Sequence, residues 1–335
     1  MAKLSMTFAC GLYDRMVPLI AGEVRPEGID LNFIRLDDPR QIFDRMGGGL
    51  EFDCSEMSSS EYISLKNAER HGGPPCPFVA IPVIASRVFR HGFIVVNRDR
   101  IHSPKDLAGK RIGVPLYTMS AAIWMRGHLT HDYGVDLSDV TWVQAAINAS
   151  KSHGEPSPPP LHRPAKIIAD TGGRSLSELL DKGEIDALLG TGMPDCMRTN
   201  PSIQRLFPNY RDVEREYYQR TKIFPIMHVV VIKKTLYEQH PFIATSLYNA
   251  FCESKDAALE RMKYIGALRY MLPWLPADLD EIEEVFGGDP WPYGVEPNRP
   301  TLEALVTYLA DQGVTQTREP VDSLFVPTYG QLTHS

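Results

Sequence analysis

Short apolar segments alternate with longer amphipathic ones along the N-terminal part of the chain. Strands are predicted at Leu4–Cys10, Ile29–Ile34 and Phe52–Ser55, and helices are predicted at 15–21, 39–46 and 58–68. An alternation of strands and helices of this kind is typical of a parallel sheet flanked by helices.

The middle of the chain repeats this pattern. The strands predicted there are Arg111–Val114, Thr141–Val143, Lys166–Ala169 and Ala187–Gly190, and the helices lie near 120–132, 175–182 and 213–220. Segment 153–164 reads HGEPSPPPLHRP, and its prolines predict a loop or an extended arm. After that the pattern becomes mostly helical, with helices predicted at 235–240, 241–264, 278–286 and 299–312.

Two strands rich in β-branched residues, Phe93–Asn97 and Pro225–Lys233, are predicted to carry the chain between two lobes. Two lobes are also expected from length, because 335 residues are too many for one typical core. The predicted fold class is α/β, with two lobes that each contain a mainly parallel sheet flanked by helices. One lobe comprises residues 1–95 and 225–335, and the other comprises residues 96–224.

Composition narrows the class of protein. Apolar residues make up 43% of the chain and charged residues 23%, which is ordinary for a globular protein, and the net charge is −7. A negative net charge argues against nucleic acid or an anionic membrane as the partner. No apolar run is long enough to span a membrane, and the start MAKLSMTFACGLYDR lacks the apolar segment of a signal peptide. We therefore expect a cytoplasmic protein.

The five cysteines are widely scattered and include no C-x-x-C pair, so buried free thiols are expected rather than disulfides or a zinc ribbon. His128 and His131 have a spacing that suits a metal, but solvated histidines are commoner at a helix end. No H-E-x-x-H, G-x-G-x-x-G or Walker motif occurs. We therefore expect no metal and no cofactor. The sequence leaves open whether the chain forms a homo-oligomer.

The region around the first predicted crossing carries the strongest signal of a binding site. Its polar members, before the crossing and at the start of the following helix, are Arg87, Arg90, His91, Tyr117, Thr118 and Ser120. Free backbone N–H groups at a helix start suit an anionic ligand, and the arginines add fixed positive charge. These residues predict a cleft between the lobes that binds a small carboxylate.

Some of these residues also have a structural interpretation. Arg87 and Arg90 are three positions apart, so in an extended segment they point to opposite faces and only one of them needs to enter the cleft. His91 lies beside a cation that favours its neutral form, which suits a base or a hydrogen-bonding group. A histidine at the start of a strand is just as often a structural donor.

A second group of candidates follows the third predicted strand, at the end of the sheet where α/β proteins bind ligands. Glu56 is the candidate for the carboxylic acid that handles a substrate proton, and the alternative is a capping carboxylate at a helix start. Ser55 and Ser58 are candidate donors or caps at the same junction. Arg15 follows the first strand and lines the same opening or pairs with Asp14.

Several segments together resemble a known family. They are FACGLYDRMVPL, LEFDCSEMSSSEYI, SRVFRHGFI, IGVPLYTMSAAIWMRG, FPIMH, MLPWL and GGDPWPYGVEPNRPTLEAL. The segments SPKDLAGKRIGVP, LDKGEIDALLG and IMHVVVIKK resemble the type II periplasmic-binding-protein fold, and the whole set resembles the cytoplasmic 4,5-dihydroxyphthalate decarboxylases. The likeness is weaker in region 148–175. It implies loss of one carboxyl group from 4,5-dihydroxyphthalate, giving protocatechuate in aromatic degradation.

His228 lies in an apolar run, where a lone histidine is usually packed in the core. Its place in the FPIMH segment, which resembles the family, makes it a candidate for the site. The candidate catalytic residues are His91, His228 and Glu56. The candidate substrate-binding residues are Arg15, Ser55, Ser58, Arg87, Arg90, Tyr117, Thr118 and Ser120.

The implied reaction needs a proton at the ring carbon that loses CO₂ and electron density from the hydroxyl para to it. Acid–base help contributes about 10²–10⁴-fold, so preorganised electrostatics must supply the rest. An arginine on the leaving carboxylate would stabilise the ground state more than the transition state. We therefore expect one carboxylate in a basic corner and the other in a drier corner, near Met119 or Trp124.

Two other functions are compatible with parts of this pattern. One is a non-catalytic binding protein for an aromatic dicarboxylate, although the expected lack of a signal peptide argues against a transport role. The other is an enzyme of pyrimidine or thiamine-precursor chemistry on the same fold. The latter would favour a cysteine-rich iron motif, and the sequence contains no such cysteine cluster.

Overall fold

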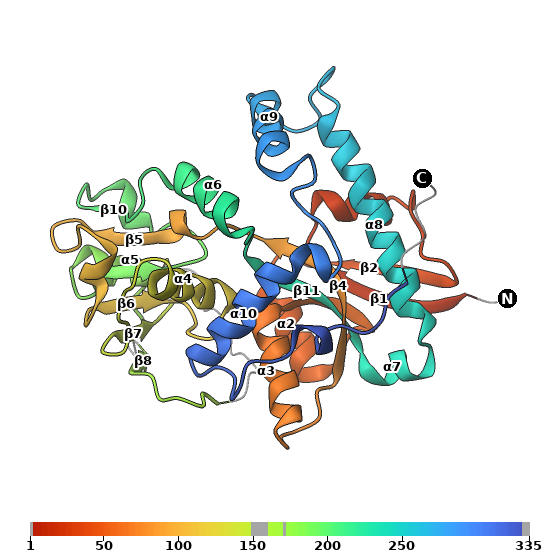
Figure 1. Cartoon of the computed structure of the whole chain (residues 1–335), viewed down its shortest axis with the longest axis horizontal. Helices are drawn as coiled ribbons and strands as arrows, with labels where there is room; N and C mark the ends of the chain where they lie inside the picture. The colour runs from red at the N-terminus through yellow and green to blue at the C-terminus, as the bar shows by residue number, and fades with distance from the viewer. Residues whose placement is uncertain (1–2, 149–159, 170–171, 330–335) are drawn as a thin grey trace.

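The computed structural model describes residues 3–148, 160–169 and 172–329, and in these ranges the strands form two separate sheets. The first sheet has the order β2-β1-β3-β11-β4, and the second has the order β10-β5-β9-β6-β7-β8. Figure 1 shows the sheets in two lobes, each with helices packed against it. The chain therefore has the two-lobed α/β architecture that the sequence predicts.

The first sheet comprises β1 (Leu4–Cys10), β2 (Ile29–Arg35), β3 (Cys54–Ser58), β4 (Phe78–Arg87) and β11 (Ile226–Lys233). The second comprises β5 (Ile94–Asn97), β6 (Arg111–Val114), β7 (Thr141–Gln144), β8 (Ile167–Ala169), β9 (Ala187–Leu189) and β10 (Ile203–Arg205). The α-helices in the described ranges are α1 (Val17–Ile20), α2 (Pro39–Gly49), α3 (Ser59–Arg70), α4 (Ser120–His131), α5 (Leu176–Asp181), α6 (Tyr210–Thr221), α7 (Lys234–Gln239), α8 (Phe242–Lys263), α9 (Leu275–Phe286) and α10 (Arg299–Asp311).

None of the helices in these ranges is both long enough and apolar enough to cross a membrane. Most of the predicted Pro-rich arm, residues 153–159, lies outside the described residues.

Both sheets are mixed. β1 pairs in parallel with β2 and β3, whereas β11 runs antiparallel to both of its neighbours, β3 and β4. In the second sheet β9, β6, β7 and β8 are parallel, and β5 and β10 add antiparallel pairs. Because β11 lies inside a sheet, its run Val229–Ile232 is buried along its whole length.

The strands near the first crossing differ from the expected pattern. The sequence pattern gives no clear strand at Phe78–Arg87, where Pro82 interrupts the apolar run. The structure places β4 there, at an edge of the first sheet, where a residue without an N–H is tolerated. The predicted crossover strand Phe93–Asn97 is instead largely β5 of the second sheet, so the predicted lobe boundary after residue 95 falls inside a strand. The two crossing segments meet where the rings of Phe89 and Phe224 stack, with centroids 4.3 Å apart.

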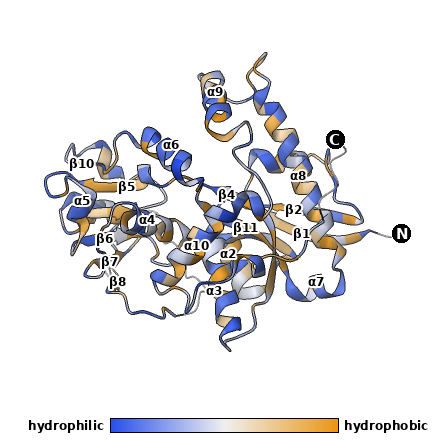
Figure 2. Cartoon of the chain, viewed as in Figure 1, coloured by the Kyte–Doolittle hydropathy of each residue, from blue (hydrophilic) through white to orange (hydrophobic). Residues whose placement is uncertain are grey.

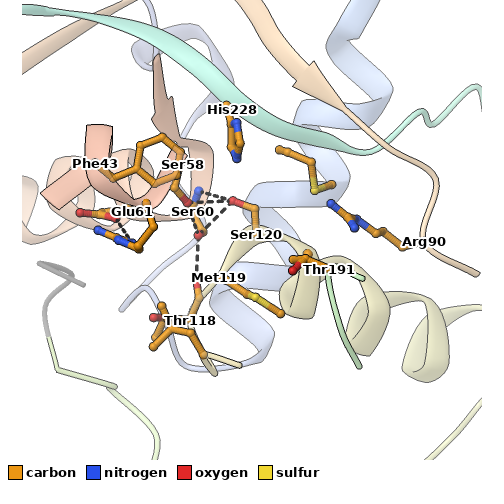
Figure 3. Close-up of a pocket in the computed structure, with 14 residues that line it drawn as sticks. Phe43, Ser58, Ser60, Glu61, Arg90, Thr118, Met119, Ser120, Thr191 and His228 are labelled. Atoms are coloured by element: carbon orange, nitrogen blue, oxygen red, sulfur yellow. Dashed lines mark hydrogen bonds and ion pairs between the residues drawn. The ribbon is translucent and has the colours of Figure 1, made fainter. Parts of the chain in front are cut away.

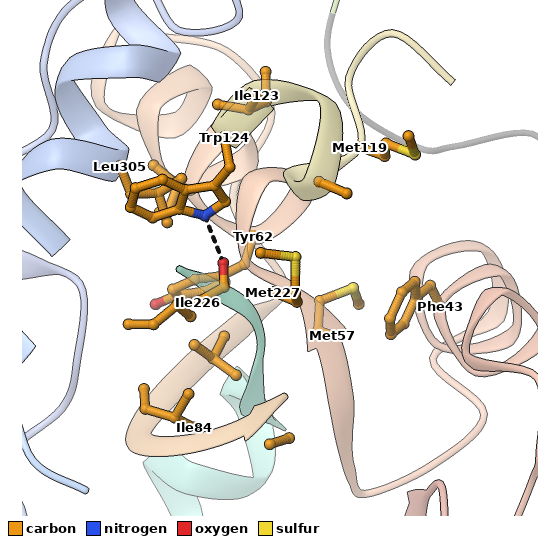
Figure 4. Close-up of a cluster of buried hydrophobic side chains, with 14 of the residues drawn as sticks. Phe43, Met57, Tyr62, Ile84, Met119, Ile123, Trp124, Ile226, Met227 and Leu305 are labelled. Carbon is orange, nitrogen blue, oxygen red and sulfur yellow. Dashed lines mark hydrogen bonds between the residues drawn. The ribbon is translucent and has the colours of Figure 1, made fainter. Parts of the chain in front are cut away.

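The two lobes share the largest apolar core, which extends from the first sheet through α4 to α10. Trp124 of α4 is fully buried in it, and its indole N–H donates to the carbonyl of Ile226 at 2.8 Å (Figure 4). A smaller apolar cluster around Leu188 covers the second sheet. Figure 2 shows the resulting pattern, with apolar strands inside and polar residues along the helices that face outward. Packing and one buried hydrogen bond therefore hold α4 against β11.

Candidate active site

A pocket opens between the lobes where the first turns of α3 and α4 approach β11 (Figure 3). We call it the cleft pocket, and its lining residues are Arg40, Phe43, Ser58, Ser60, Glu61, Arg90, Leu116, Thr118, Met119, Ser120, Ala121, Thr191, Met227 and His228. Its empty space is ≈ 470 Å³ with the open mouth included. The pocket lies beyond the C-terminal ends of β3 and β6, where α/β sheets bind their ligands.

Serine hydroxyls join the two lobes at the floor of the cleft pocket. The Oγ of Ser120, at the start of α4, lies 3.0 Å from Ser58 Oγ and 3.1 Å from Ser59 Oγ. The Ser60 N–H donates to Ser120 Oγ at 3.1 Å, and the Ser60 hydroxyl donates to the carbonyl of Thr118 at 2.8 Å. The N-cap residues of α3 and α4 form no side-chain cap. The positive ends of both helices thus meet at the pocket, an arrangement that favours an anion.

Arg90 brings a full positive charge to the same pocket (Figure 3). The residue is 5% exposed, and its guanidinium carbon lies 4.9 Å from the centre of the Phe93 ring. Among the residues that the structure describes, its Nε has no hydrogen-bond partner. Burial lowers the pKa of Arg90 to about 10, against a smaller opposite effect of Glu214, so the group stays charged at neutral pH. In the described part of the chain Arg90 forms no ion pair, so its charge is available to a ligand.

A second arginine on the wall, Arg40, is already neutralised. Its guanidinium pairs with Asp44 at 2.5 Å and with Glu61 at 3.3 Å. It also lies 5.3 Å from the centre of the Phe43 ring. Arg40 therefore contributes hydrogen-bond donors and shape to the pocket, but little net charge.

His228 lines the pocket and is held from behind by Glu56. The Nδ1 of His228 lies 3.2 Å from Glu56 Oε2, and the Phe43 ring contacts the imidazole edge-on at 4.9 Å. Glu56 is fully buried and also accepts hydrogen bonds from the Gly11 N–H and the Tyr13 hydroxyl, both at 2.9 Å. An ionised carboxylate can only accept, so Nδ1 carries the proton and Nε2 is the nitrogen left for a ligand.

The protonation state of Glu56 follows from these contacts. Burial is the largest single effect and raises the pKa of Glu56, but the hydrogen bond and charge of His228 oppose it. The Gly11 and Tyr13 donors add to that opposition, and the net pKa lies below its ordinary value. The sequence suggests Glu56 as the acid that handles a substrate proton. The structure instead places it behind His228 as a buried carboxylate.

Five of the eleven predicted site residues line the cleft pocket. They are Ser58, Arg90, Thr118, Ser120 and His228. Glu56 lies one layer behind the pocket wall, and Ser55 is a buried residue of β3 beside it.

His91 lies outside the cleft pocket. It is fully buried, and its ring stacks on His128 with centroids 4.6 Å apart. Burial, and after it the neighbouring His128, lowers the pKa of His91 to about 3, so the ring is neutral. Neither ring nitrogen of His91 has a hydrogen-bond partner in the described residues, so the ring is not the structural donor that the sequence offered as an alternative. His91 is not among the residues that line the cleft pocket.

Arg87, Arg15 and Tyr117 also point elsewhere. Arg87 donates to the carbonyls of Phe224 at 3.3 Å and Pro292 at 3.2 Å and to the Asn298 side chain. Arg15 pairs with Asp14 at 3.1 Å and lies between two aromatic rings, those of Tyr13 and Trp291, each with its centre 4.3 Å away. Tyr117 packs against the guanidinium of Arg126, 3.8 Å from its ring centre. The Arg15–Asp14 pair is the alternative that the sequence allowed, whereas the partners of Arg87 are distant in sequence, and the local pattern does not reveal them.

Several lining residues are absent from the sequence prediction. They are Arg40, Phe43, Ser60, Glu61, Leu116, Ala121, Thr191 and Met227. Ser60, Glu61 and Thr191 follow strand ends, so the rule that ligands bind there could have identified them. Arg40 and Phe43 lie within a helix, and only the packing of α2 beside β3 brings them to the pocket. In the described ranges no group of three or more His, Cys, Asp or Glu side chains is placed to hold a metal ion.

Comparisons with known proteins define first the class and then the family. The sequence model of the family described as NMT1/THI5 like matches residues 73–154. The structure is similar to the periplasmic aliphatic sulphonate binding protein SsuA from Escherichia coli, with a TM-score of 0.51 and 10% identity over 98% of this chain and 94% of that one. This similarity concerns the fold alone, and it places the chain in the periplasmic-binding-protein-like class.

Two curated relatives carry the same name. The chain is 38% identical to 4,5-dihydroxyphthalate decarboxylase of Comamonas testosteroni over 98% of both chains. It is 37% identical to 4,5-dihydroxyphthalate decarboxylase of Pseudomonas putida over 65% of this chain and 83% of that relative. The chain belongs to the 4,5-dihydroxyphthalate decarboxylase family.

The depressed pKa of Glu56 predicts a pH-dependent contribution to stability. A carboxylate with a lowered native pKa stabilises the fold above the ordinary Glu value of about 4.3, and this stabilisation is lost as the pH falls through the native pKa. We expect Glu56→Gln to lower the free energy of unfolding at neutral pH by about 1.5–3 kcal/mol. The gap from wild type should shrink below about pH 4.

Urea unfolding at neutral and acidic pH measures this difference. The matched control is Glu260→Gln, at a side chain that is 76% exposed, and its stability should match wild type at both pH values. A loss for Glu56→Gln that is equal at both pH values would contradict an ionised Glu56.

Proposed function

We propose that this protein removes one carboxyl group from 4,5-dihydroxyphthalate, giving 3,4-dihydroxybenzoate (protocatechuate) and CO₂ in the degradation of phthalate. The observation that carries the proposal is membership of the decarboxylase family along nearly the whole chain, at 38% identity over 98% of its length. The cleft pocket supports it, because two helix N-termini and a buried Arg90, which has no ion-pair partner in the described part of the chain, suit a small dianion.

The symmetry of this substrate makes the pocket decide which carboxylate leaves. In free 4,5-dihydroxyphthalate the two carboxylates are equivalent, and each lies para to one hydroxyl. A guanidinium on the leaving carboxylate would stabilise the ground state more than the transition state, because the negative charge moves into the ring. Arg90 therefore holds the carboxylate that stays, through a charge-assisted hydrogen bond. The leaving carboxylate faces the apolar wall of Phe43, Met119 and Met227.

His228 is the group that exchanges a proton with the substrate. His228 lines the cleft pocket, its Nδ1 lies 3.2 Å from the Glu56 carboxylate, and its Nε2 is the nitrogen left for the substrate. When His228 takes the proton of the para hydroxyl, electron density moves into the ring and favours protonation, by a solvent water, at the carbon that loses CO₂. The bond from that carbon to the carboxylate then breaks, its electron pair restores the aromatic ring, CO₂ leaves, and the His228 imidazolium returns its proton to the phenolate oxygen. Glu56 stabilises the imidazolium formed in this step and keeps the ring oriented, so it acts through His228 and does not contact the substrate.

Turnover is the direct test of the proposed activity. We expect the purified chain, treated with a chelator and then desalted, to convert 4,5-dihydroxyphthalate to 3,4-dihydroxybenzoate with release of equimolar CO₂. Chromatography of the aromatic compounds and a CO₂ assay measure the two products. Tight binding of the substrate without product would instead identify a binding protein, and activity that returns only with added metal would refute the expectation of a cofactor-free reaction.

Arg90→Ala tests the assignment of the binding cation. We expect KM to rise by about ten- to hundredfold, because one charge-assisted contact is lost, with a smaller change in kcat. Arg90→Lys should recover part of the affinity, since it restores the charge but not the planar fork. The control is Arg35→Ala, because Arg35 is exposed and is not among the residues that line the pocket. An unchanged KM in a folded Arg90→Ala protein would show that the substrate lies elsewhere.

His228→Gln tests the proton-transfer group. We expect kcat to fall by about 10²–10⁴-fold with little change in KM, because binding by Arg90 is unaffected. His102→Gln, at an exposed histidine outside the pocket, is the matched control and should retain wild-type rates. Circular dichroism checks the fold, and a His228→Gln protein with normal kcat would reduce this residue to a packing role.

We also propose that the protein works in the cytoplasm. All five cysteines are free and four of them are buried, and unpaired thiols are typical of a reducing compartment. Recovery of the native protein from the periplasmic fraction of its cells would contradict this location.

A further inference from the structure

The connector between α8 and α9, residues 264–274, exposes large apolar side chains to water. Met271 is 101% exposed and Trp274 is 78% exposed, and four more are about half exposed, namely Tyr264, Ile265, Leu268 and Leu272. Figure 1 shows this connector and α9 projecting from the lobe that contains the first sheet. Single exposed apolar residues are normal, but a contiguous set of this kind marks a contact site.

An apolar cavity lies at the base of the same helical hairpin. We call it the hairpin cavity, and its empty space is ≈ 870 Å³ with the mouth included. The apolar side chains that line it include Leu259, Met262, Ile282, Phe286, Phe224 and Trp291. The hairpin thus carries both a projecting apolar group and a recess of matching chemistry and sufficient size.

The hairpin carries exposed charged side chains of both signs. Arg269 in the connector lies over the Tyr264 ring, 5.2 Å from its centre, and forms no ion pair within the described residues. On α9, Asp280 and Glu284 are exposed and have no basic partner in the described part of the chain. The hairpin therefore carries both a cation and an acidic helix that a second copy of the same surface can match.

We propose that the α8–α9 hairpin is a self-association surface, in which Met271 and Trp274 of one copy enter the hairpin cavity of a second copy. In a two-fold interface each copy supplies the same patch, so each must carry the projection and the recess together, as this hairpin does. The acidic side chains of α9 disfavour an anionic membrane as the occupant. A different protein would not require both complementary features on one chain.

Sedimentation velocity of the full chain over a concentration series tests the proposal. The wild-type chain should sediment as a dimer or a larger even-numbered assembly. Met271→Ser and Trp274→Ser should each raise the dissociation constant of the assembly about tenfold or more, because buried Trp and Met side chains dominate such contacts. Both side chains are exposed in the single chain, so neither change should disturb folding, which circular dichroism verifies.

The matched control is Tyr329→Ser, which removes an aromatic residue that is 76% exposed on another part of the surface, and its assembly should equal wild type. A wild-type chain that stays monomeric at every concentration overturns the proposal. Connector variants that assemble as well as wild type overturn it too, as does binding of the wild-type monomer to anionic vesicles through this connector.

Complementation tests the projection-into-recess geometry. Leu259→Trp fills the hairpin cavity and Trp274→Ser removes the projection, so each variant alone should dissociate. A mixture of the two retains one intact contact, because the Trp274 of the filled copy can enter the empty cavity of the other. Heterodimers should therefore form at lower concentration than either homodimer, and a mixture no stronger than its components would refute this geometry.

Discussion

The contact between the start of α4 and the first sheet is the constraint on which the rest of the structure depends. Ser120 meets the hydroxyls of Ser58 and Ser59 at 3.0 and 3.1 Å, and Trp124, one turn later, donates to the carbonyl of Ile226 at 2.8 Å. These groups are buried, and a buried polar group that loses its partner costs about 1–3 kcal/mol. Because the contact joins the two lobes at the floor of the cleft pocket, it also sets the separation of the pocket walls.

The distribution of partners among the arginines explains how a chain with a net charge of −7 can attract a dianion. Arg15 and Arg40 pair with carboxylates, and Arg87 is satisfied by backbone carbonyls and an amide side chain. Arg90 alone among these four lacks such a partner in the described residues, and it faces the pocket. A buried unpaired charge is unfavourable, so an anionic ligand that supplies the missing partner binds with that free energy in its favour.

Stacked aromatic rings and hydrogen bonds hold the crossing segments against both lobes. On one side the rings of His91 and His128 stack in a buried cluster, and on the other the rings of Phe89 and Phe224 stack across the two crossings. Arg87 ties the end of β4 to the loop at Pro292 and to Asn298. Residues that look chemically active in the sequence thus hold the segment that positions Arg90, which is why they lie near the site without lining it.

Local patterns in the sequence were sufficient for most strands and helices, because hydrophobic periodicity reports directly which residues are buried. They also located the polar helix start at Thr118 and Ser120 and, through family resemblance, His228. One missed strand, β4, contains Pro82, which is acceptable because β4 lies at a sheet edge and its register with β11 shifts at that residue. Which arginine faces the pocket was decided by tertiary structure alone. Arg87 and Arg90 are near neighbours in the sequence, but Arg87 is held by Pro292 and Asn298, whose approach depends on the packing of the whole chain.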